Sequence, residues 1–330
     1  MRAFGRILAL LGLAVVATSA QAQSQAPYPN KNIRILVPYG PGGLTDVITR
    51  HYAEHLRKSL GQNIVVENKP GASGIRAIEE MTHAKPDGYT IMVGNISTNC
   101  LTPILLSKRM RINYDRDVQI IARTAEAPVF FLATTTNFPP KTFAEFIEYA
   151  KKNEVRYASA GIGAYQHVNT EILSKRAGGL KLLHIPFKDG GSAILKDVAS
   201  GDTHVSWFNI TNPVGMIKAG KVRPLAVAAP QRLKDWPDVP TITEVGFPGF
   251  RPSQWNAAFA HSSVPREIID KLHEAFSAAA KTPEMKAVFE KGGLAAPTEK
   301  SADEARAWLK KEMETWRRDI ADAGITVVTD

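Results

Sequence analysis

The sequence predicts an α/β protein of two similar lobes, each a mostly parallel sheet flanked by helices. Short β-branched runs alternate with amphipathic helical stretches, first over residues 33–93 and again over residues 129–228. Such strand–helix alternation favours parallel strands that are covered by helices on both faces. The chain has 330 residues, a length that usually divides into two compact bodies. Two lobes with a cleft between them are therefore the leading architecture.

The elements of the first lobe follow from apolar periodicity and from glycine positions. Residues 33–37 are a β-branched strand, and residues 44–60 place apolar side chains on one helix face until Gly61 ends the helix. A second strand is expected at residues 63–67, a second helix at 74–83 and a third strand at 89–93.

The same signals return in the second lobe. Strands are expected at residues 129–134, 156–159, 180–185, 203–208 and 223–228, with helices at 142–152, 164–176 and 192–200. A proline-rich stretch, residues 230–252, leads to one more strand at 255–260. The tail over residues 265–323 is helical, and the pattern leaves open which lobe it joins.

Composition and charge exclude several classes of protein. The chain is 44% hydrophobic and 22% charged, which excludes a disordered protein. Its 41 Lys and Arg residues against 32 Asp and Glu residues give a net charge of +9. These charges are dispersed, with no basic run containing aromatic residues, so nucleic acid is not an expected partner. The single cysteine, Cys100, excludes an internal disulfide and a cysteine-cluster metal site.

The first 22 residues have the pattern of a secretory signal peptide. Arg2 and Arg6 precede an apolar run at residues 7–16, and residues 20–22 (Ala-Gln-Ala) form a small-x-small cleavage site. The alternative is an N-terminal membrane anchor, for which the apolar run is short. We expect export of the chain and cleavage after residue 22.

Two glycine-rich junctions between a strand and a helix indicate a binding site. The first, residues 36–46, reads Leu-Val-Pro-Tyr-Gly-Pro-Gly-Gly-Leu-Thr-Asp; the second, residues 157–167, reads Tyr-Ala-Ser-Ala-Gly-Ile-Gly-Ala-Tyr-Gln-His. Ligands of open α/β sheets bind beyond the strand ends, where the next helix offers unpaired N–H groups and its positive dipole end. Paired turns, one per lobe, predict an anion held from both sides. The main contacts are expected from the backbone N–H groups of Gly42, Gly43, Gly163 and Ala164.

The alternative is that each is a structural turn without a ligand, because glycines after strands are common in α/β proteins. Neither turn is a nucleotide-binding fingerprint. Residues 40–43 lack the G-x-G-x-x-G spacing, and Gln166 stands where a third glycine of the second turn would fall. The expected ligand is thus a small anion, and no cofactor is required.

Several sequence blocks are similar to those of a known family. The blocks are Pro41-Gly42-Gly43 with Asp46 and Arg50; residues 66–71 and 86–90; residues 157–159 with Gly161, Gly163 and His167; and residues 217–221 and 238–241. In order and spacing they resemble the extracytoplasmic solute-binding receptors of tripartite tricarboxylate transporters, also called Bug-type receptors. The resemblance runs from residue 28 to residue 325, about the whole mature chain.

The resemblance implies a type II, flytrap-like periplasmic binding protein without catalytic activity. Lobe 1 would comprise residues 27–126 and 238–330, including the C-terminal helices, and lobe 2 residues 127–237. The implied ligand is a di- or tricarboxylate or an aromatic acid, bound in the interlobe cleft by backbone groups and ordered waters. The implied partners are the membrane permease subunits of a tripartite transporter. A sensor that feeds a signalling partner is an alternative that the sequence leaves open.

The chain departs from the family's usual pattern at several positions. Ala164 stands where Ser or Thr is usual, so Tyr165, Ser159 or water must compensate for the missing hydroxyl. Asp46 matches the family's aspartate, and because an unpaired carboxylate repels an anion, we expect it to cap or to orient water. Asp189 follows Lys188 where the family often has glycine directly. It is a candidate to set specificity by accepting a hydrogen bond, and the alternative is that it caps the next helix.

The remaining candidates end strands at the same rim or line the cleft. They are Tyr39, Asn95, Ser97, Ser159, Gly161, Tyr165, His167, Asn209 and Trp255. The alternatives are structural: turn chemistry for Asn95 and Ser97, a satisfied histidine for His167, and lobe packing for Trp255.

One enzymatic alternative, a zinc hydrolase, rests on a single motif. His51, Glu54 and His55 have the H-x-x-E-H order of an inverted zinc-peptidase motif, with both histidines on one helix face. No third ligand is identified, and the apolar side chains from Ile48 to Leu56 occupy the inward face of the same helix. We therefore expect neither a metal nor an enzyme.

Overall fold

The computed structural model describes residues 27–127, 130–187, 191–209, 212–250, 252 and 254–326. Residues Met1–Asn30 and Lys31–Asp330 are two separate units, and every element described below belongs to the second. The predicted signal peptide at residues 1–22 lies outside the described residues, as do Lys188 and Asp189.

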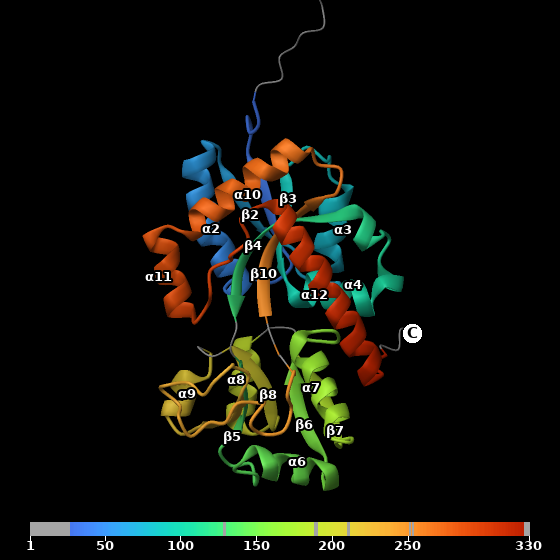
Figure 1. The fold of residues 1–330 in the computed structure, drawn as a ribbon, viewed down its shortest axis with the longest axis vertical. Coiled ribbons are helices and arrows are strands. Elements are labelled where there is room, and N and C mark those ends of the chain that lie inside the picture. The colour runs from blue at the N-terminus through green and yellow to red at the C-terminus, as the bar shows by residue number, and fades with distance from the viewer. Residues whose placement is uncertain are drawn as a thin grey trace, which may run out of the picture. The chain divides into compact units, whose positions relative to one another are not determined.

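The first lobe is built on a five-stranded mixed sheet with the strand order β2–β1–β3–β10–β4 (Figure 1). β1 (Ile33–Val37) pairs in parallel with β2 (Ile64–Asn68) and with β3 (Thr90–Asn95). β10 (Gln254–His261) runs antiparallel both to β3 and to β4 (Val118–Ala127). The first strand and the late strand of the chain thus share one sheet.

Helices pack on both faces of this sheet. The longer ones are α2 (Leu44–Leu60), α3 (Ile75–His83), α10 (Arg266–Ala280), α11 (Pro283–Gly292) and α12 (Ala302–Ala323). Five short helices complete the lobe: η2 (Ala72–Gly74), η3 (Ser97–Leu101), α4 (Thr102–Leu105), η4 (Ser107–Arg109) and α5 (Tyr114–Asp117). α2 and α10 meet on one face, where the rings of Tyr52 and Phe276 lie 5.3 Å apart. α3 and α12 pack on the opposite face of the sheet. Their apolar side chains belong to the cluster that contains Leu36 of β1 and Met92 of β3, whose side chains point to that face.

The second lobe repeats the arrangement with the strand order β7–β6–β8–β5–β9. Its strands are β5 (Phe130–Thr135), β6 (Val155–Ser159), β7 (Leu182–Pro186), β8 (Val205–Asn209) and β9 (Val222–Val227). β6 is parallel to β7 and β8, and β5 is antiparallel to β8 and β9. Its helices are α6 (Phe143–Lys152), α7 (Tyr165–Arg176), α8 (Gly191–Ser200) and α9 (Val214–Lys218).

The two-lobed α/β architecture is the predicted one, but both sheets are mixed rather than mostly parallel. The chain leaves the first sheet through β4, enters the second through β5 and returns through β10, and these strands run against their neighbours. β4 is absent from the sequence prediction. Arg123 and Thr124 interrupt its apolar pattern although both are buried in the fold.

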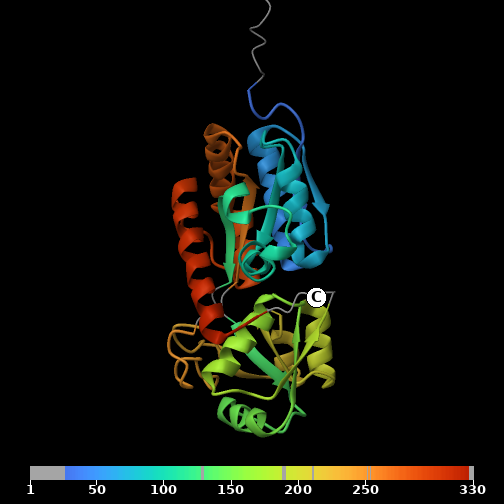
Figure 2. The same cartoon turned by 90° about the vertical axis from the view of Figure 1, so that its right-hand side faces the viewer.

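The C-terminal helices pack against the first sheet. α10 contacts α2 and β4, while α12 contacts β4 and also α7 of the second lobe (Figures 1 and 2). α12 begins where the Ser301 hydroxyl accepts a hydrogen bond from the Glu304 N–H, and it ends at Gly324 with φ +66°. This one helix therefore touches both lobes.

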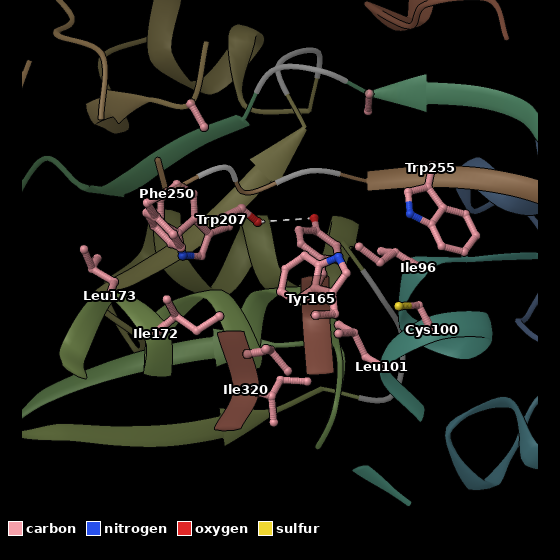
Figure 3. Close-up of a cluster of buried hydrophobic side chains, with 14 of the residues drawn as sticks. Ile96, Cys100, Leu101, Tyr165, Ile172, Leu173, Trp207, Phe250, Trp255 and Ile320 are labelled. Carbon is pink, nitrogen blue, oxygen red and sulfur yellow. Dashed lines mark hydrogen bonds between the residues drawn. The ribbon is translucent and has the colours of Figure 1, made fainter. Parts of the chain in front are cut away.

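A continuous cluster of buried apolar side chains joins the two lobes. Figure 3 shows Tyr165 of α7 between Trp207 of β8 on one side and Cys100 and Leu101 of η3 on the other. The Tyr165 hydroxyl donates to the Trp207 carbonyl at 3.5 Å. Within the part of the chain that the structure describes, no helix is both long and apolar enough to cross a membrane.

Candidate functional site

The first glycine turn, residues 40–43, connects β1 to α2. Gly42 has φ +86°, a left-handed conformation that favours glycine. α2 begins after Gly43, whose lack of a side chain leaves the helix without a side-chain cap. The positive end of the helix dipole thus lies at an exposed turn of small residues.

Asp46 is buried beneath this turn and is fully engaged by protein donors. Its side chain is held by the Gly42 N–H at 2.9 Å, the Arg50 guanidinium at 3.0 Å and the Asn68 amide at 2.9 Å. Burial favours the protonated acid, but these donors outweigh it and lower the pKa of Asp46 below its ordinary value. Asp46 therefore fixes the turn rather than presenting a free charge at its surface.

Tyr39, Asn95 and Ser97 form a hydrogen-bonded chain at the ends of β1 and β3. The Tyr39 hydroxyl donates to Asn95 Oδ1 at 2.7 Å, and the Ser97 N–H donates to the same oxygen at 3.0 Å. Burial raises the pKa of Tyr39 to about 12, and the hydrogen bond to Asn95 opposes part of that rise. Tyr39 is thus a neutral hydroxyl at physiological pH.

Two further polar residues, Thr45 and Asn256, adjoin this hydrogen-bonded group. Neither was predicted from the sequence as a site residue. Thr45 Oγ1 accepts from Asn256 Nδ2 at 2.8 Å and from Asn95 Nδ2 at 3.4 Å, and all three residues are buried. The available signal was Asn256 itself, a polar residue in an otherwise apolar stretch of β10. Buried amides at strand ends are suited to orienting a polar ligand.

The second glycine turn, residues 161–163, connects β6 to α7. Gly161 and Gly163 have φ values of +116° and +79°. The hydroxyl of Ser159 accepts from the Gly161 N–H at 3.0 Å, and it lies in hydrogen-bond contact with His184 Nε2. Ser159 therefore supports the turn from within the fold.

His167 and His184 lie side by side behind the second turn. Their ring centroids are 4.5 Å apart, and His167 Nδ1 accepts from the Gly163 N–H at 3.4 Å. Burial lowers the pKa of both histidines to about 4, and in His184 the nearby His167 adds to that effect. Both rings are therefore neutral at physiological pH, and His184, which was not predicted, joins the candidate site.

A direct hydrogen bond joins the two lobes beside the glycine turns. Ser97 Oγ of the first lobe accepts from the Tyr165 N–H of the second lobe at 3.1 Å, and both residues are buried. A weaker contact runs from the Ser73 hydroxyl to the Ile162 carbonyl at 3.4 Å. These two bonds join the lobes close to the second glycine turn, one of them through the predicted residues Ser97 and Tyr165.

The backbone N–H groups expected to bind an anion are mostly occupied within the protein. Gly42 N–H donates to Asp46, Gly163 N–H to His167, and Ala164 N–H to the Gly161 carbonyl at 3.1 Å. The Gly43 N–H is the one of the four without an acceptor among the residues that the structure describes. An anion would reach the other three only by exchange with these internal acceptors.

Asn209 lies at the sheet edge of the second glycine turn, because β8 is parallel to β6, whereas Trp255 faces away from the polar network of the first lobe. Trp255 is the neighbour of Asn256 on β10, so the two side chains leave opposite faces of the sheet. Trp255 faces a groove of about 700 Å³ whose wall also includes Trp308 and Glu312 of α12. Asn209 ends β8 opposite Phe130 and is buried.

The H-x-x-E-H motif does not gather a metal-binding set. Glu54 pairs with Arg57 at 2.9 Å, and His55 Nε2 lies 3.4 Å from Thr282 Oγ1. Among the described positions, no group of three or more His, Cys, Asp or Glu side chains is arranged to hold a metal ion.

Comparison with known proteins decides the family. Residues 48–325 match the model of the tripartite tricarboxylate transporter family receptor, TctC. The chain belongs to this family. The TctC family is a family of solute-binding receptors and not of enzymes, so the zinc-hydrolase alternative has no support.

Curated relatives of this TctC-family chain occur in Bordetella pertussis. One is a UPF0065 protein that is 34% identical over 280 residues, or 84% of each chain. Another is Protein BugT, 28% identical over 97% of this chain and 98% of BugT.

Solved structures confirm the two-lobed periplasmic binding protein fold. The periplasmic binding protein BugD is 29% identical, with a TM-score of 0.79 over 91% of this chain and 99% of BugD. MatC from Rhodopseudomonas palustris, solved with bound malate, is 29% identical, with a TM-score of 0.80 over 89% of this chain and 100% of MatC. A second R. palustris protein, solved with adipate, is 26% identical, with a TM-score of 0.81 over 91% of this TctC-family chain and 100% of that protein.

Proposed function

We propose that this TctC-family receptor captures a small carboxylate between its lobes and delivers it to the membrane permease subunits of a tripartite transporter. The proposed ligand is a di- or tricarboxylate or an aromatic acid. Lobe 1 would comprise residues 27–126 and 238–330, and lobe 2 residues 127–237. Cleavage of the signal peptide at residues 1–22 would release the receptor into the periplasm.

One observation carries the proposal: the two helices that begin at the glycine turns, one in each lobe, both start without a side-chain cap of their own. The N-cap residues of α2 and α7 are Gly43 and Ala164, and neither provides a side-chain acceptor. Helix N-termini favour anions because their N–H groups and dipoles point outward. The relatives solved with malate and adipate support a carboxylate as the anion.

The polar side chains around the two turns favour a ligand that both accepts and donates hydrogen bonds. Tyr39, Asn95 and Asn256 supply neutral groups, and His167 and His184 are neutral as well. Of the predicted site residues that the structure describes, Asp46 is the one carboxylate, and Arg50 pairs with it at 3.0 Å. Differential affinity for the closed arrangement of the lobes would then drive closure.

Titration calorimetry with a panel of organic acids tests the proposal. The panel contains malate, adipate, citrate and terephthalate, with the corresponding uncharged amides as controls. We expect at least one acid to bind with micromolar or tighter affinity, a free energy of about −8 kcal/mol, and its amide to bind far more weakly. Failure of every acid in a wider thermal-shift screen would reject a carboxylate receptor.

A further inference from the structure

Four exposed basic side chains of the first lobe belong to segments that reach the second glycine turn. They are Arg76 of α3, Lys108 and Arg109 of η4, and Arg111, two residues after η4. None of the four forms an ion pair with an acidic side chain among the residues that the structure describes. Their positive charges are therefore free to act on ions in solution.

Other basic side chains of this lobe are held by acids. Arg34, for example, pairs with Glu67 at 2.7 Å. One acid, Glu79, does lie beside the four cations, but its carboxylate accepts from the backbone N–H of Arg111 at 2.7 Å and not from a guanidinium. The four cations thus outnumber the acid next to them.

The segment from α4 to η4 carries two of the cations to the turn. A Cβ placed on Gly163 would lie 3.8 Å from Leu105 Cδ1 at the end of α4. Lys108 follows Leu105 by three residues, so their Cα atoms lie within about 11 Å of each other. This span is close to the distance of about 10 Å over which 0.1 M salt screens a charge. An anion at the second turn therefore experiences the charge of Lys108.

The loop before α3 brings Arg76 to the same turn. A Cβ placed on Gly71 would lie 3.9 Å from Arg76 Cδ, so the Arg76 side chain runs along this loop. The Ser73 hydroxyl of the loop contacts the Ile162 carbonyl of the turn at 3.4 Å. Ile162 is 47% exposed, so solvent ions reach the turn at this point.

We propose that Arg76, Lys108, Arg109 and Arg111 form a basic ridge that concentrates small anions at the second glycine turn. Like charges beside a cleft raise the local concentration and the association rate of ions of the opposite sign. Because the attraction grows with the charge of the ion, the ridge favours a di- or tricarboxylate over a monocarboxylate. The link to ligand capture rests on the proposed function, whereas the effect of the ridge on anions does not.

Association kinetics test the effect of the ridge on ligand capture. Lys108→Gln/Arg109→Gln removes two charges of the ridge, and Lys58→Gln/Lys286→Gln removes two exposed charges from the last turn of α2 and from α11 as the matched control. For a dicarboxylate that binds in the calorimetric panel, the ridge variant should associate roughly eightfold more slowly than the parent at about 0.01 M ionic strength and about twofold more slowly at about 0.15 M. Stopped-flow tryptophan fluorescence should show unchanged dissociation rates, and the control should associate like the parent.

Quenching of a dye at the turn tests the ridge without any ligand. An uncharged dye is attached to Ile162→Cys, and the native Cys100 is buried. Adding Lys108→Gln/Arg109→Gln should lower the quenching constant of iodide by roughly 40% at about 0.1 M ionic strength. Quenching by uncharged acrylamide should not change. Ser73→Cys, at an exposed position, is a second attachment site if Ile162→Cys does not fold.

The two measurements separate failure of the ridge from failure of the proposed function. Unchanged iodide quenching would overturn the ridge, as would an unchanged association rate or a slower rate that salt does not restore. If no acid binds and iodide quenching still falls, the carboxylate proposal is rejected and the ridge stands.

Discussion

Trp255 and Trp316 donate their indole N–H groups to the same atom, Oε1 of Glu312, at distances of 3.1 and 3.0 Å. Trp255 belongs to β10 of the first sheet, and Trp316 lies four residues after Glu312 on α12. The shared carboxylate therefore ties the long C-terminal helix to the strand that returns from the second lobe.

Replacing Glu312 should destabilise this attachment. Glu312→Ala leaves two largely buried indole N–H groups without their acceptor, at an expected cost of about 1–3 kcal/mol in the free energy of unfolding. Urea unfolding followed by tryptophan fluorescence measures the loss. Glu314→Ala, at an exposed site on the same helix, should cost far less, and equal losses in the two variants would argue against the shared acceptor.

Removing the charge of Asp46 should lower stability in a pH-dependent way. Asp46→Asn weakens the bonds from the Gly42 N–H and Arg50, with an expected loss of about 1–3 kcal/mol at pH 7. The pKa of Asp46 is lower in the folded protein than its ordinary value of 3.8, so its contribution is fully present above 3.8. The contribution is lost as the pH falls through the folded-state pKa.

The difference between parent and Asp46→Asn in urea unfolding should therefore shrink between pH 5 and pH 2.5. Asp322→Asn, at an exposed position near the end of α12, is the control and should behave like the parent at every pH. A constant difference across this range would mean that the ionised state of Asp46 does not matter.

The half-buried His167 and His184 should make the protein less stable in mild acid. The pKa of His167 is about 4 in the fold against an ordinary value of 6.5, so the unfolded chain binds more protons between these values. Stability should fall as the pH drops from 6.5 toward 4, by at most about 1.4 kcal/mol per pH unit for each histidine. His184 is partly exposed, so solvent screening makes its contribution to this loss of stability smaller.

His167→Gln should reduce this slope, measured as the change in urea midpoint between pH 8 and pH 5. At pH 8 both imidazoles are neutral in the folded and unfolded chains, so the comparison there isolates the loss of the Gly163 contact. A slope identical to that of the parent would show that proton uptake occurs elsewhere.

A side chain at Gly163 should abolish ligand binding without unfolding the protein. In Gly163→Val the residue has φ +79°, which a β-branched side chain tolerates poorly, and the new Cβ would lie 3.8 Å from Leu105 Cδ1 of the other lobe. Gly178→Val is a matched control with φ +84° and open space around it, at the far end of α7. Both should lose about 1–3 kcal/mol of stability, but calorimetry with the acid panel should show lost affinity only for Gly163→Val. Equal affinities would remove the second turn from the site.

The sequence reveals elements whose signals are local, and it misses those that depend on distant partners. The helix at Leu44–Leu60 is correct at both ends, because its apolar periodicity and Gly61 are visible in the chain itself. β4 is invisible because Arg123 looks exposed, whereas in the fold it is paired with Glu299 at 2.7 Å and lies over the Trp308 ring. Strand direction is likewise a property of the whole sheet.

In the candidate site, too, some residues can be predicted from local sequence pattern and others depend on distant partners. Glycine turns and strand ends locate Tyr39, Asn95 and Ser159 from local pattern alone. The roles of Thr45, Asn256 and His184 could not be predicted, because each depends on a neighbour that the chain supplies from another strand or helix. The bond between Ser97 and Tyr165 spans 68 residues and joins two lobes, so no local pattern encodes it.

The position of Cys100 has a practical consequence. It is the only cysteine of the chain, it is fully buried, and burial raises the pKa of its thiol well above the usual range. A maleimide dye at neutral pH will therefore leave Cys100 unmodified. A single cysteine introduced on the surface gives a uniformly labelled protein, and a fluorescent reporter for lobe movement can be installed without first engineering the native thiol away.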